Sequence, residues 1–117
     1  MSDKIKIGQE GEEIAVGFLE EKGYQVIARN FRAGQAEIDL IAEKDFWLIF
    51  VEVKLRSGRS FGPPEIFVNR AKRQNVRSAA RQYLFDRNWK GNVRFDVIAI
   101  TRGGSRQEIH HIMDAFH

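Results

Sequence analysis

Ala36 to Ala42 reads Ala-Glu-Ile-Asp-Leu-Ile-Ala, and Phe50 to Lys54 reads Phe-Val-Glu-Val-Lys. Both stretches are mainly apolar, and each carries two charged residues two positions apart. Side chains of a β-strand alternate between its two faces. In the first stretch this alternation sends one set of residues to each face, namely Glu37, Asp39 and Ile41 against Ile38, Leu40 and Ala42. In the second stretch it groups Phe50, Glu52 and Lys54 opposite Val51 and Val53.

The two stretches belong to longer strand candidates, 36–43 and 46–55, which lie so close in the sequence that we expect a β-hairpin. A register that pairs residues whose numbers sum to 91 leaves Asp45 and Phe46 as a two-residue turn. This register sets Asp39 opposite Glu52 and Glu37 opposite Lys54. Directly opposed side chains lie about 5 Å apart, so two carboxylates there repel each other unless a cation lies between them.

A divalent metal ion is the cation that suits this pair. Mg²⁺ takes hard oxygen ligands, commonly one or two carboxylates with waters and substrate phosphate oxygens, and Asp39 with Glu52 supplies such carboxylates. Lys54 lies on the same predicted face, where it can activate a water and stabilise charge on a phosphate. The alternative is a solvated face whose charges form ion pairs worth at most about 1 kcal/mol each. The apolar run 47–51 favours the site, because it is typical of a strand buried on both faces.

Periodicity elsewhere predicts two helices, at about 6–21 and 69–88, and further strands at 24–29, 93–101 and 107–113. Turns are expected at 30–35 and at Gly103-Gly104, and a loop at 56–64. The order of elements is therefore α-β-β-β-α-β-β. There is no internal repeat or linker, so we expect residues 1–117 to form one α/β domain, with a mixed central sheet flanked by helices.

The composition narrows the classes of function. The 117 residues include no cysteine, which excludes a disulfide scaffold, a zinc-thiolate site and a thiol nucleophile. No apolar stretch approaches the roughly 20 residues that span a bilayer, and we expect a cytoplasmic protein without a membrane partner. The net charge of +3 is unevenly distributed. Residues 1–53 carry six Lys or Arg against eleven Asp or Glu, and residues 54–117 carry thirteen against five. This asymmetry suits a metal-dependent enzyme acting on a phosphate polymer, or else reflects segregated surface charges.

The second predicted helix carries a ridge of arginines at i, i+3, i+7 and i+11, namely Arg70, Arg73, Arg77 and Arg81. Such a ridge can follow a phosphate backbone, or it can be a solubilising face. Lys72 differs, because it shares a face with the apolar residues of the helix and is expected to point inward or extend from the rim. There it can balance the charge of the carboxylates or contact a phosphate.

The loop after the second charged strand is the expected clamp on nucleic acid. It carries Arg56 and Arg59, and Phe61 either stacks on a base or anchors the loop to the core. His110, His111 and His117 have no metal-ligand spacing and are expected at the surface.

The charged hairpin resembles the active-site signature of the PD-(D/E)xK nuclease superfamily, which has the restriction-endonuclease-like fold. The whole string is similar to the YraN family of small bacterial proteins over about residues 8–100. That string comprises Gly8-x-x-Gly11-Glu12, Glu37-Ile38-Asp39-Leu40-Ile41, Phe50-Val51-Glu52-Val53-Lys54-Leu55-Arg56, Phe61-Gly62, Lys72 and Arg94-Phe95-Asp96-Val97. Two positions depart from the pattern, because Ile38 replaces the proline of the superfamily name and Ala36 stands where the family usually has glycine.

The resemblance implies a fold related to archaeal Holliday-junction resolvases. It also implies that Asp39 and Glu52 are metal ligands, Lys54 is the catalytic lysine and Glu12 is an accessory carboxylate. Without the resemblance, the preferred interpretation of Glu12 is an ordinary acid in the first turn of a helix, where the helix dipole favours it.

These observations lead to one hypothesis and two alternatives. The hypothesis is an endonuclease that hydrolyses DNA phosphodiesters with Mg²⁺ or Mn²⁺, on branched or structured DNA, with Glu37 as a further carboxylate of the site. The alternatives are a nucleic-acid-binding module without turnover and an adaptor that binds a protein partner. Retention of Asp39, Glu52 and Lys54 favours the enzyme, because binding alone needs no carboxylates that repel phosphate. The sequence does not decide between a monomer and a homodimer.

Overall fold

The computed structural model describes residues 3–58, 61 and 69–116. Two helices and five strands follow in the predicted order α-β-β-β-α-β-β. They are α1 (Asp3–Glu21), β1 (Gln25–Ala33), β2 (Ala36–Lys44), β3 (Trp47–Ser57), α2 (Arg70–Arg87), β4 (Asn92–Gly103) and β5 (Arg106–Ile112). In this part of the chain no helix is both long and apolar enough to cross a membrane.

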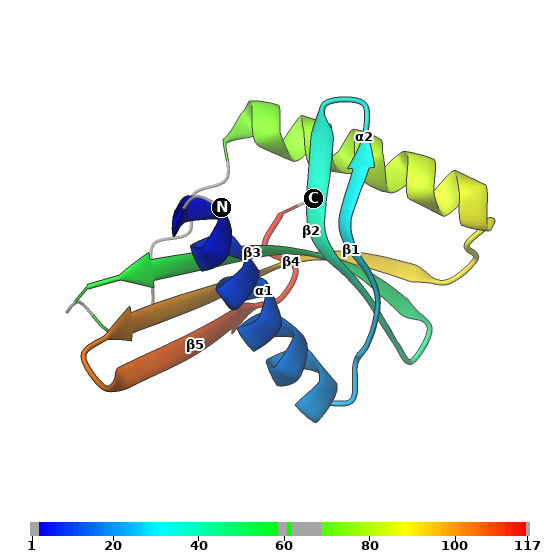
Figure 1. Cartoon of the computed structure of the whole chain (residues 1–117). Helices are drawn as coiled ribbons and strands as arrows, with labels where there is room; N and C mark the ends of the chain where they lie inside the picture. The colour runs from blue at the N-terminus through cyan, green and yellow to red at the C-terminus, as the bar shows by residue number, and fades with distance from the viewer. Residues whose placement is uncertain (1–2, 59–60, 62–68, 117) are drawn as a thin grey trace.

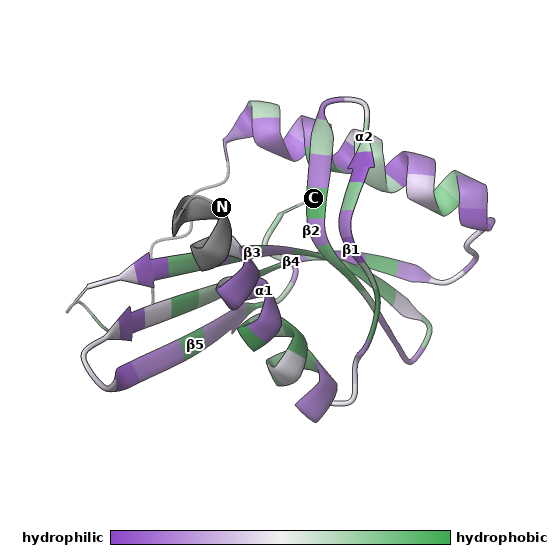
Figure 2. Cartoon of the chain, in the orientation of Figure 1, coloured by the Kyte–Doolittle hydropathy of each residue, from purple (hydrophilic) through white to green (hydrophobic). Residues whose placement is uncertain are grey.

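The five strands form one mixed sheet in the order β1-β2-β3-β4-β5. All neighbours are antiparallel except β3 and β4, which run parallel over their whole length. A parallel pair requires a crossover connection, and the segment that contains α2 provides it. Figure 1 shows α1 and α2 on different sides of the sheet, and in Figure 2 the edge strand β5 is mostly hydrophilic.

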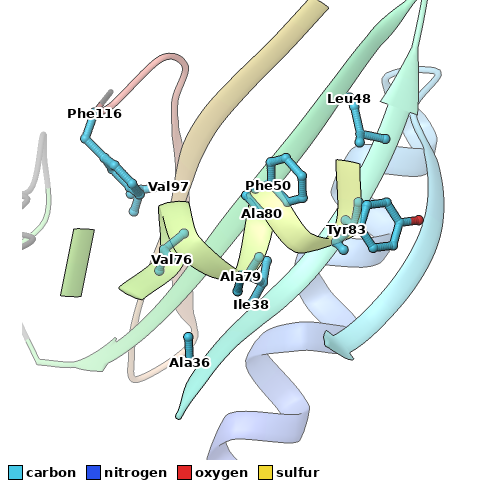
Figure 3. Packing of buried hydrophobic residues seen from close by; sticks show 11 residues of the cluster. Ala36, Ile38, Leu48, Phe50, Val76, Ala79, Ala80, Tyr83, Val97 and Phe116 are labelled. Carbon is cyan, nitrogen blue, oxygen red and sulfur yellow. The ribbon is translucent and has the colours of Figure 1, made fainter. Parts of the chain in front are cut away.

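The sheet separates two hydrophobic cores. The α2-side core contains Phe50, Leu48 and Val97 of the sheet and the apolar stripe of α2 (Figure 3). The α1-side core contains Leu19 of α1 together with Ile49 and Val51 of β3. Successive residues of β3 therefore contribute to opposite cores, as expected for a strand buried on both faces.

Helix α2 matches its predicted bounds because both of its ends are capped by asparagine. The side chain of Asn69 accepts a hydrogen bond from the backbone N–H of Lys72 at 2.8 Å, which satisfies one of the free donors of the first turn. Asn88 takes the left-handed conformation (φ 51°) and donates its backbone N–H to the carbonyls of the last turn. The stripe that the helix buries is Val76, Ala79, Ala80 and Tyr83.

The predicted hairpin register is confirmed where β2 pairs with β3. The ladder runs from Lys44–Trp47 to Leu40–Val51, so Asp45 and Phe46 form the two-residue turn. Both turn residues have positive φ, 50° and 69°. Beyond Leu40 no further pairs between the two strands occur, whereas β3 continues beside β4 as far as Ser57. Figure 1 shows the corresponding end of β2 turning toward α2.

Three predictions about strand boundaries and faces were wrong. The turn expected at 30–35 is confined to Gly34 and Gln35, because β1 continues to Ala33 as an edge strand that tolerates polar residues on its open side. The turn after β4 begins at Gly104, since Gly103 still pairs with Arg106. Ile38 was expected on the face of Leu40, but it lies in the α2-side core (Figure 3), because β2 bends where it leaves β3.

Candidate metal centre

The end of the β2–β3 ladder leaves a small pocket between the sheet and α2. Its volume is about 10 Å³, room for about one water molecule. Three of the predicted site carboxylates and one lysine line it. The lining residues are Glu37, Ile38, Asp39, Phe50, Val51, Glu52, Lys72, Val76 and Phe116. The structure thus brings Asp39 and Glu52 to one pocket, although the strand ladder stops before it would pair them.

Where the β2–β3 ladder ends, the carboxylate of Asp39 replaces a backbone carbonyl as the acceptor for a β3 N–H. Its Oδ2 accepts a hydrogen bond from the backbone N–H of Val53 at 2.8 Å. That N–H belongs to the part of β3 that β2 no longer pairs, so it needs another acceptor. Burial raises the pKa of Asp39 to about 6, and the negative charge of Glu52 acts in the same direction. The N–H of Val53 opposes the rise only in part.

Glu52 forms an ion pair with Lys72 of α2, and Glu52 is the more buried of the two residues. Its Oε1 lies 2.7 Å from Nζ of Lys72, and the two side chains are 13% and 50% exposed. Its other oxygen, Oε2, is buried and accepts no hydrogen bond within the described part of the chain. A buried carboxylate oxygen without a partner carries a desolvation cost of roughly 1–3 kcal/mol or more. Such an atom is therefore a candidate ligand for a cation.

The residues of the pocket fit a hard divalent cation but supply only some of its ligands. Two carboxylates and one unsatisfied buried oxygen match what Mg²⁺ takes from proteins, which is often only one or two carboxylates with water and substrate oxygens. Among residues 3–58, 61 and 69–116, no three His, Asp or Glu side chains gather closely enough to hold a metal ion by themselves. Any metal held here therefore depends on water or substrate for the rest of its ligands.

Other predicted carboxylates and Lys54 lie around this pair. Glu37 lines the pocket but forms an ion pair with Arg32 of β1 at 3.3 Å, and it does not pair with Lys54 as the register predicted, because the ladder ends first. Glu12 of α1 accepts a hydrogen bond from Asn30 at 3.0 Å, and its charge still contributes to the raised pKa of Asp39. Lys54 pairs with Ala99 of β4 and is not part of the pocket wall.

The predicted nucleic-acid contacts are distributed over α2 and the end of β3. Arg70 and Arg81 are exposed, and Arg73 and Arg77 are half-buried. The Nε of Arg73 is buried without a hydrogen-bond partner among the described residues. Arg56 is exposed and lies in β3, which continues to Ser57, so the prediction that it belongs to the following loop was wrong.

Arg59 lies outside the described residues. Phe61 packs under the guanidinium of Arg106, whose Cζ is 4.3 Å from the ring centre.

A second cluster of charges, which the sequence analysis did not identify, lies at the junction of β4 and β5. Asp96 is fully buried, and its carboxylate receives Nε and Nη2 of Arg94 at 2.8 and 2.9 Å. His111 Nε2 lies 2.6 Å from the same carboxylate, and Arg94 also donates to the Tyr24 hydroxyl at 2.8 Å. His111 is only 5% exposed, so the prediction that it lies at the surface was wrong. The signal in the sequence was a lone aspartate within the apolar strand 93–101.

This cluster serves the fold, because it joins β4, β5 and Tyr24, the residue that precedes β1. Burial raises the pKa of Asp96, but the hydrogen bonds from His111, Arg94 and the backbone N–H of Asp114 outweigh it, so the net pKa is lowered. The Arg-Phe-Asp-Val motif that carries part of the family resemblance is thus explained by packing. His110 pairs with Glu108 at 3.3 Å on the edge strand.

Comparison with known proteins identifies a family. The profile described as "Uncharacterised protein family UPF0102" matches residues 11–100. A UPF0102 protein of Rhodococcus jostii is 41% identical over 119 residues, which cover 99% of this chain and all of that protein. A UPF0102 protein of Cytophaga hutchinsonii is 42% identical over 96% of both chains, and one of Thermodesulfovibrio yellowstonii is 40% identical over 97% of both.

Proposed function

The chain belongs to the UPF0102 family, also called the YraN family, and on that premise we propose that it is a metal-dependent nuclease of the PD-(D/E)xK superfamily that hydrolyses DNA. The observation that carries the proposal is the shared pocket of Asp39 and Glu52, in which a carboxylate oxygen of Glu52 is buried without a partner among the residues that the structure describes. Natural proteins rarely bury carboxylates side by side unless a cation or a function compensates them.

In the proposed mechanism, Asp39 and Glu52 would hold Mg²⁺ or Mn²⁺. The ion would supply Lewis-acid chemistry there, which polarises a phosphoryl oxygen and makes a water molecule more acidic. Asp39 is held in place for this task by the N–H of Val53. Lys54 follows Glu52 on the same side of β3, by strand alternation, and would stabilise the negative charge of the phosphate. Glu12 and Glu37 act as accessory carboxylates around the pair.

DNA is the proposed substrate because phosphate is what the basic half of the chain attracts. Arg70 and Arg81 are exposed on α2, the helix that also supplies the pocket with Lys72. Arginines on such a face contribute affinity that depends on salt and only weakly on sequence. Branched or structured DNA is the proposed form on the strength of the resemblance to Holliday-junction resolvases.

One observation favours a second candidate, a nucleic-acid-binding module without turnover. Glu52 is already neutralised by Lys72 at 2.7 Å, so the carboxylate pair has a counter-ion of its own. The two candidates differ in whether the wild-type chain cleaves any substrate that it binds.

The test measures cleavage and equilibrium binding on the same single-stranded, duplex, flap and four-way junction substrates, with Mg²⁺ or Mn²⁺. Asp39→Ala should abolish cleavage and leave affinity unchanged or slightly higher, since it deletes a charge that repels phosphate. Lys54→Ala should also abolish cleavage but weaken binding slightly. Asp86→Ala, which removes an exposed acid at the end of α2, is the matched control and should cleave like wild type. Should folded Asp39→Ala cleave as fast as the parent, the nuclease proposal fails, and binding without cleavage by wild type would favour the module.

A further inference from the structure

Lys72 sits where the electrostatics of its own helix disfavour it. The first turn of α2 contains no acid and instead carries Arg70, Lys72 and Arg73. The N-terminus of a helix bears partial positive charge and favours acidic residues. Local helix energetics therefore do not explain a lysine at this position. The contact that does is tertiary, the ion pair between Nζ of Lys72 and Oε1 of Glu52 at 2.7 Å.

From this placement we propose that Lys72 is a resident counter-ion, which holds the carboxylate pair together and which a divalent metal must displace from Glu52. This inference rests on the metal site of the proposed function. It adds a competitor to that site, supplied by the protein itself. Lys72 is then a positioning residue that sets metal affinity, rather than a permanent partner of Glu52.

The asymmetry of the ion pair shows which partner can withdraw. The side chain of Lys72 is half-exposed, and its flexible four-carbon stem can carry the ammonium into water. Glu52 is 13% exposed and is fixed in β3, which pairs with β4 at this position. Displacement therefore moves the lysine and leaves the carboxylate in the pocket.

The ion pair also compensates Glu52 incompletely. Oε1 receives the ammonium, but Oε2 remains buried without a partner among the described residues. The ammonium also attracts the charge of Asp39, because Lys72 lowers the pKa of Asp39 and Asp39 raises the pKa of Lys72. A single positive charge thus serves two carboxylates, and a doubly charged ion would serve them better at short range.

Displacement has a consequence for substrate binding. Once Lys72 leaves Glu52, its ammonium remains on the α2 side of the pocket that it lines, where it can attract a substrate phosphate. Metal binding would thus release the ammonium of Lys72, which in the metal-free protein is paired with Glu52.

The test is a Mn²⁺ titration of the full-length protein without DNA, in which the electron paramagnetic resonance signal of free Mn²⁺ reports binding. Lys72→Met removes the competing charge and should bind Mn²⁺ about tenfold more tightly than wild type. Lys72→Arg keeps the charge and should stay within about twofold of wild type. Lys90→Met deletes an exposed lysine beyond the other end of α2 and is the matched control, also expected within about twofold.

The outcomes separate this inference from the proposed function. Equal affinity of wild type and Lys72→Met would overturn the counter-ion role and leave the metal site standing. Weaker binding by Lys72→Met would overturn it too, because Lys72 would then support the ligands without competing. No binding by either protein up to millimolar Mn²⁺ would refute the metal site and the inference with it. Thermal unfolding monitors folding, and Mn²⁺ should raise the Tm of Lys72→Met more than that of wild type. Lys72→Gln replaces Lys72→Met if the latter does not fold.

Discussion

Replacing Asp39 by asparagine should make the metal-free protein more stable at neutral pH. Burial raises the pKa of Asp39 from 3.8 to about 6, which corresponds to about 3 kcal/mol of unfavourable free energy for the charged form. Asparagine removes the charge and keeps a side-chain oxygen that can accept the N–H of Val53. It also loses attraction to Lys72, and Asp39 is not fully buried, so we expect a net gain of about 1–2 kcal/mol.

The gain should depend on pH in a defined direction. Because the folded-state pKa of Asp39 is raised, the stability associated with its protonation is fully present below about pH 4 and is lost as the pH rises through about 6. The difference between Asp39→Asn and wild type should therefore be small at pH 4 and reach its full size by pH 7. Urea unfolding followed by circular dichroism, with EDTA present, measures the free energy of unfolding across this range.

An exposed aspartate provides the control for this experiment. Asp86→Asn makes the same chemical change at the surface of α2 and should alter stability by less than about 0.5 kcal/mol between pH 5 and 7. The reasoning is refuted if Asp39→Asn destabilises the protein at pH 7, or if its effect does not change between pH 4 and pH 7. Either result would mean that the carboxylate of Asp39 is well compensated in the metal-free fold.

Three further predictions concern other parts of the chain. Asp96→Asn should cost about 3 kcal/mol in urea unfolding at pH 7, because it leaves a largely buried guanidinium without its carboxylate. Since the pKa of Asp96 is lowered, the stability of wild type relative to Asp96→Asn should be lost as the pH falls below the ordinary range of a carboxyl group. Equal stability of the two proteins at pH 7 would contradict this prediction. Phe46→Gly should raise the free energy of unfolding by about 0.5–1 kcal/mol, because Phe46 has φ 69°, which glycine adopts without strain, and its side chain is 79% exposed. A lower free energy of unfolding would instead show that the phenyl ring stabilises the fold. Reversing Arg70 and Arg81 to Glu should weaken DNA binding and flatten its salt dependence by about one unit of log-log slope per lost contact, and an unchanged slope would identify the ridge as a solvated face.

The elements that local rules govern could be predicted from the sequence. The hairpin register follows from alternating residues on both sides of the Asp45-Phe46 turn. The bounds of α2 follow from Asn69 and Asn88 at its ends and from its apolar stripe. Such features depend on residues two to four positions apart, so a single segment contains all the information that they need. The hairpin also brings Asp39 and Glu52 to the same end of the ladder, although their common pocket depends on how β2 leaves β3.

Contacts between distant segments were decided only by the tertiary structure. Lys72 meets Glu52 because α2 crosses the sheet at the point where β2 leaves β3, and the angle of that departure is not encoded in either strand alone. The same departure places Ile38 in the α2-side core, whereas strand alternation predicted it on the opposite face. Arg94 joins Tyr24 across 70 positions of sequence, since a buried carboxylate gathers whatever donors the packed sheet brings within reach. Sheet bending and the compensation of buried charge are properties of the whole packed chain. The sequence could therefore predict that Lys72 points inward, but only the tertiary structure decided that it pairs with Glu52.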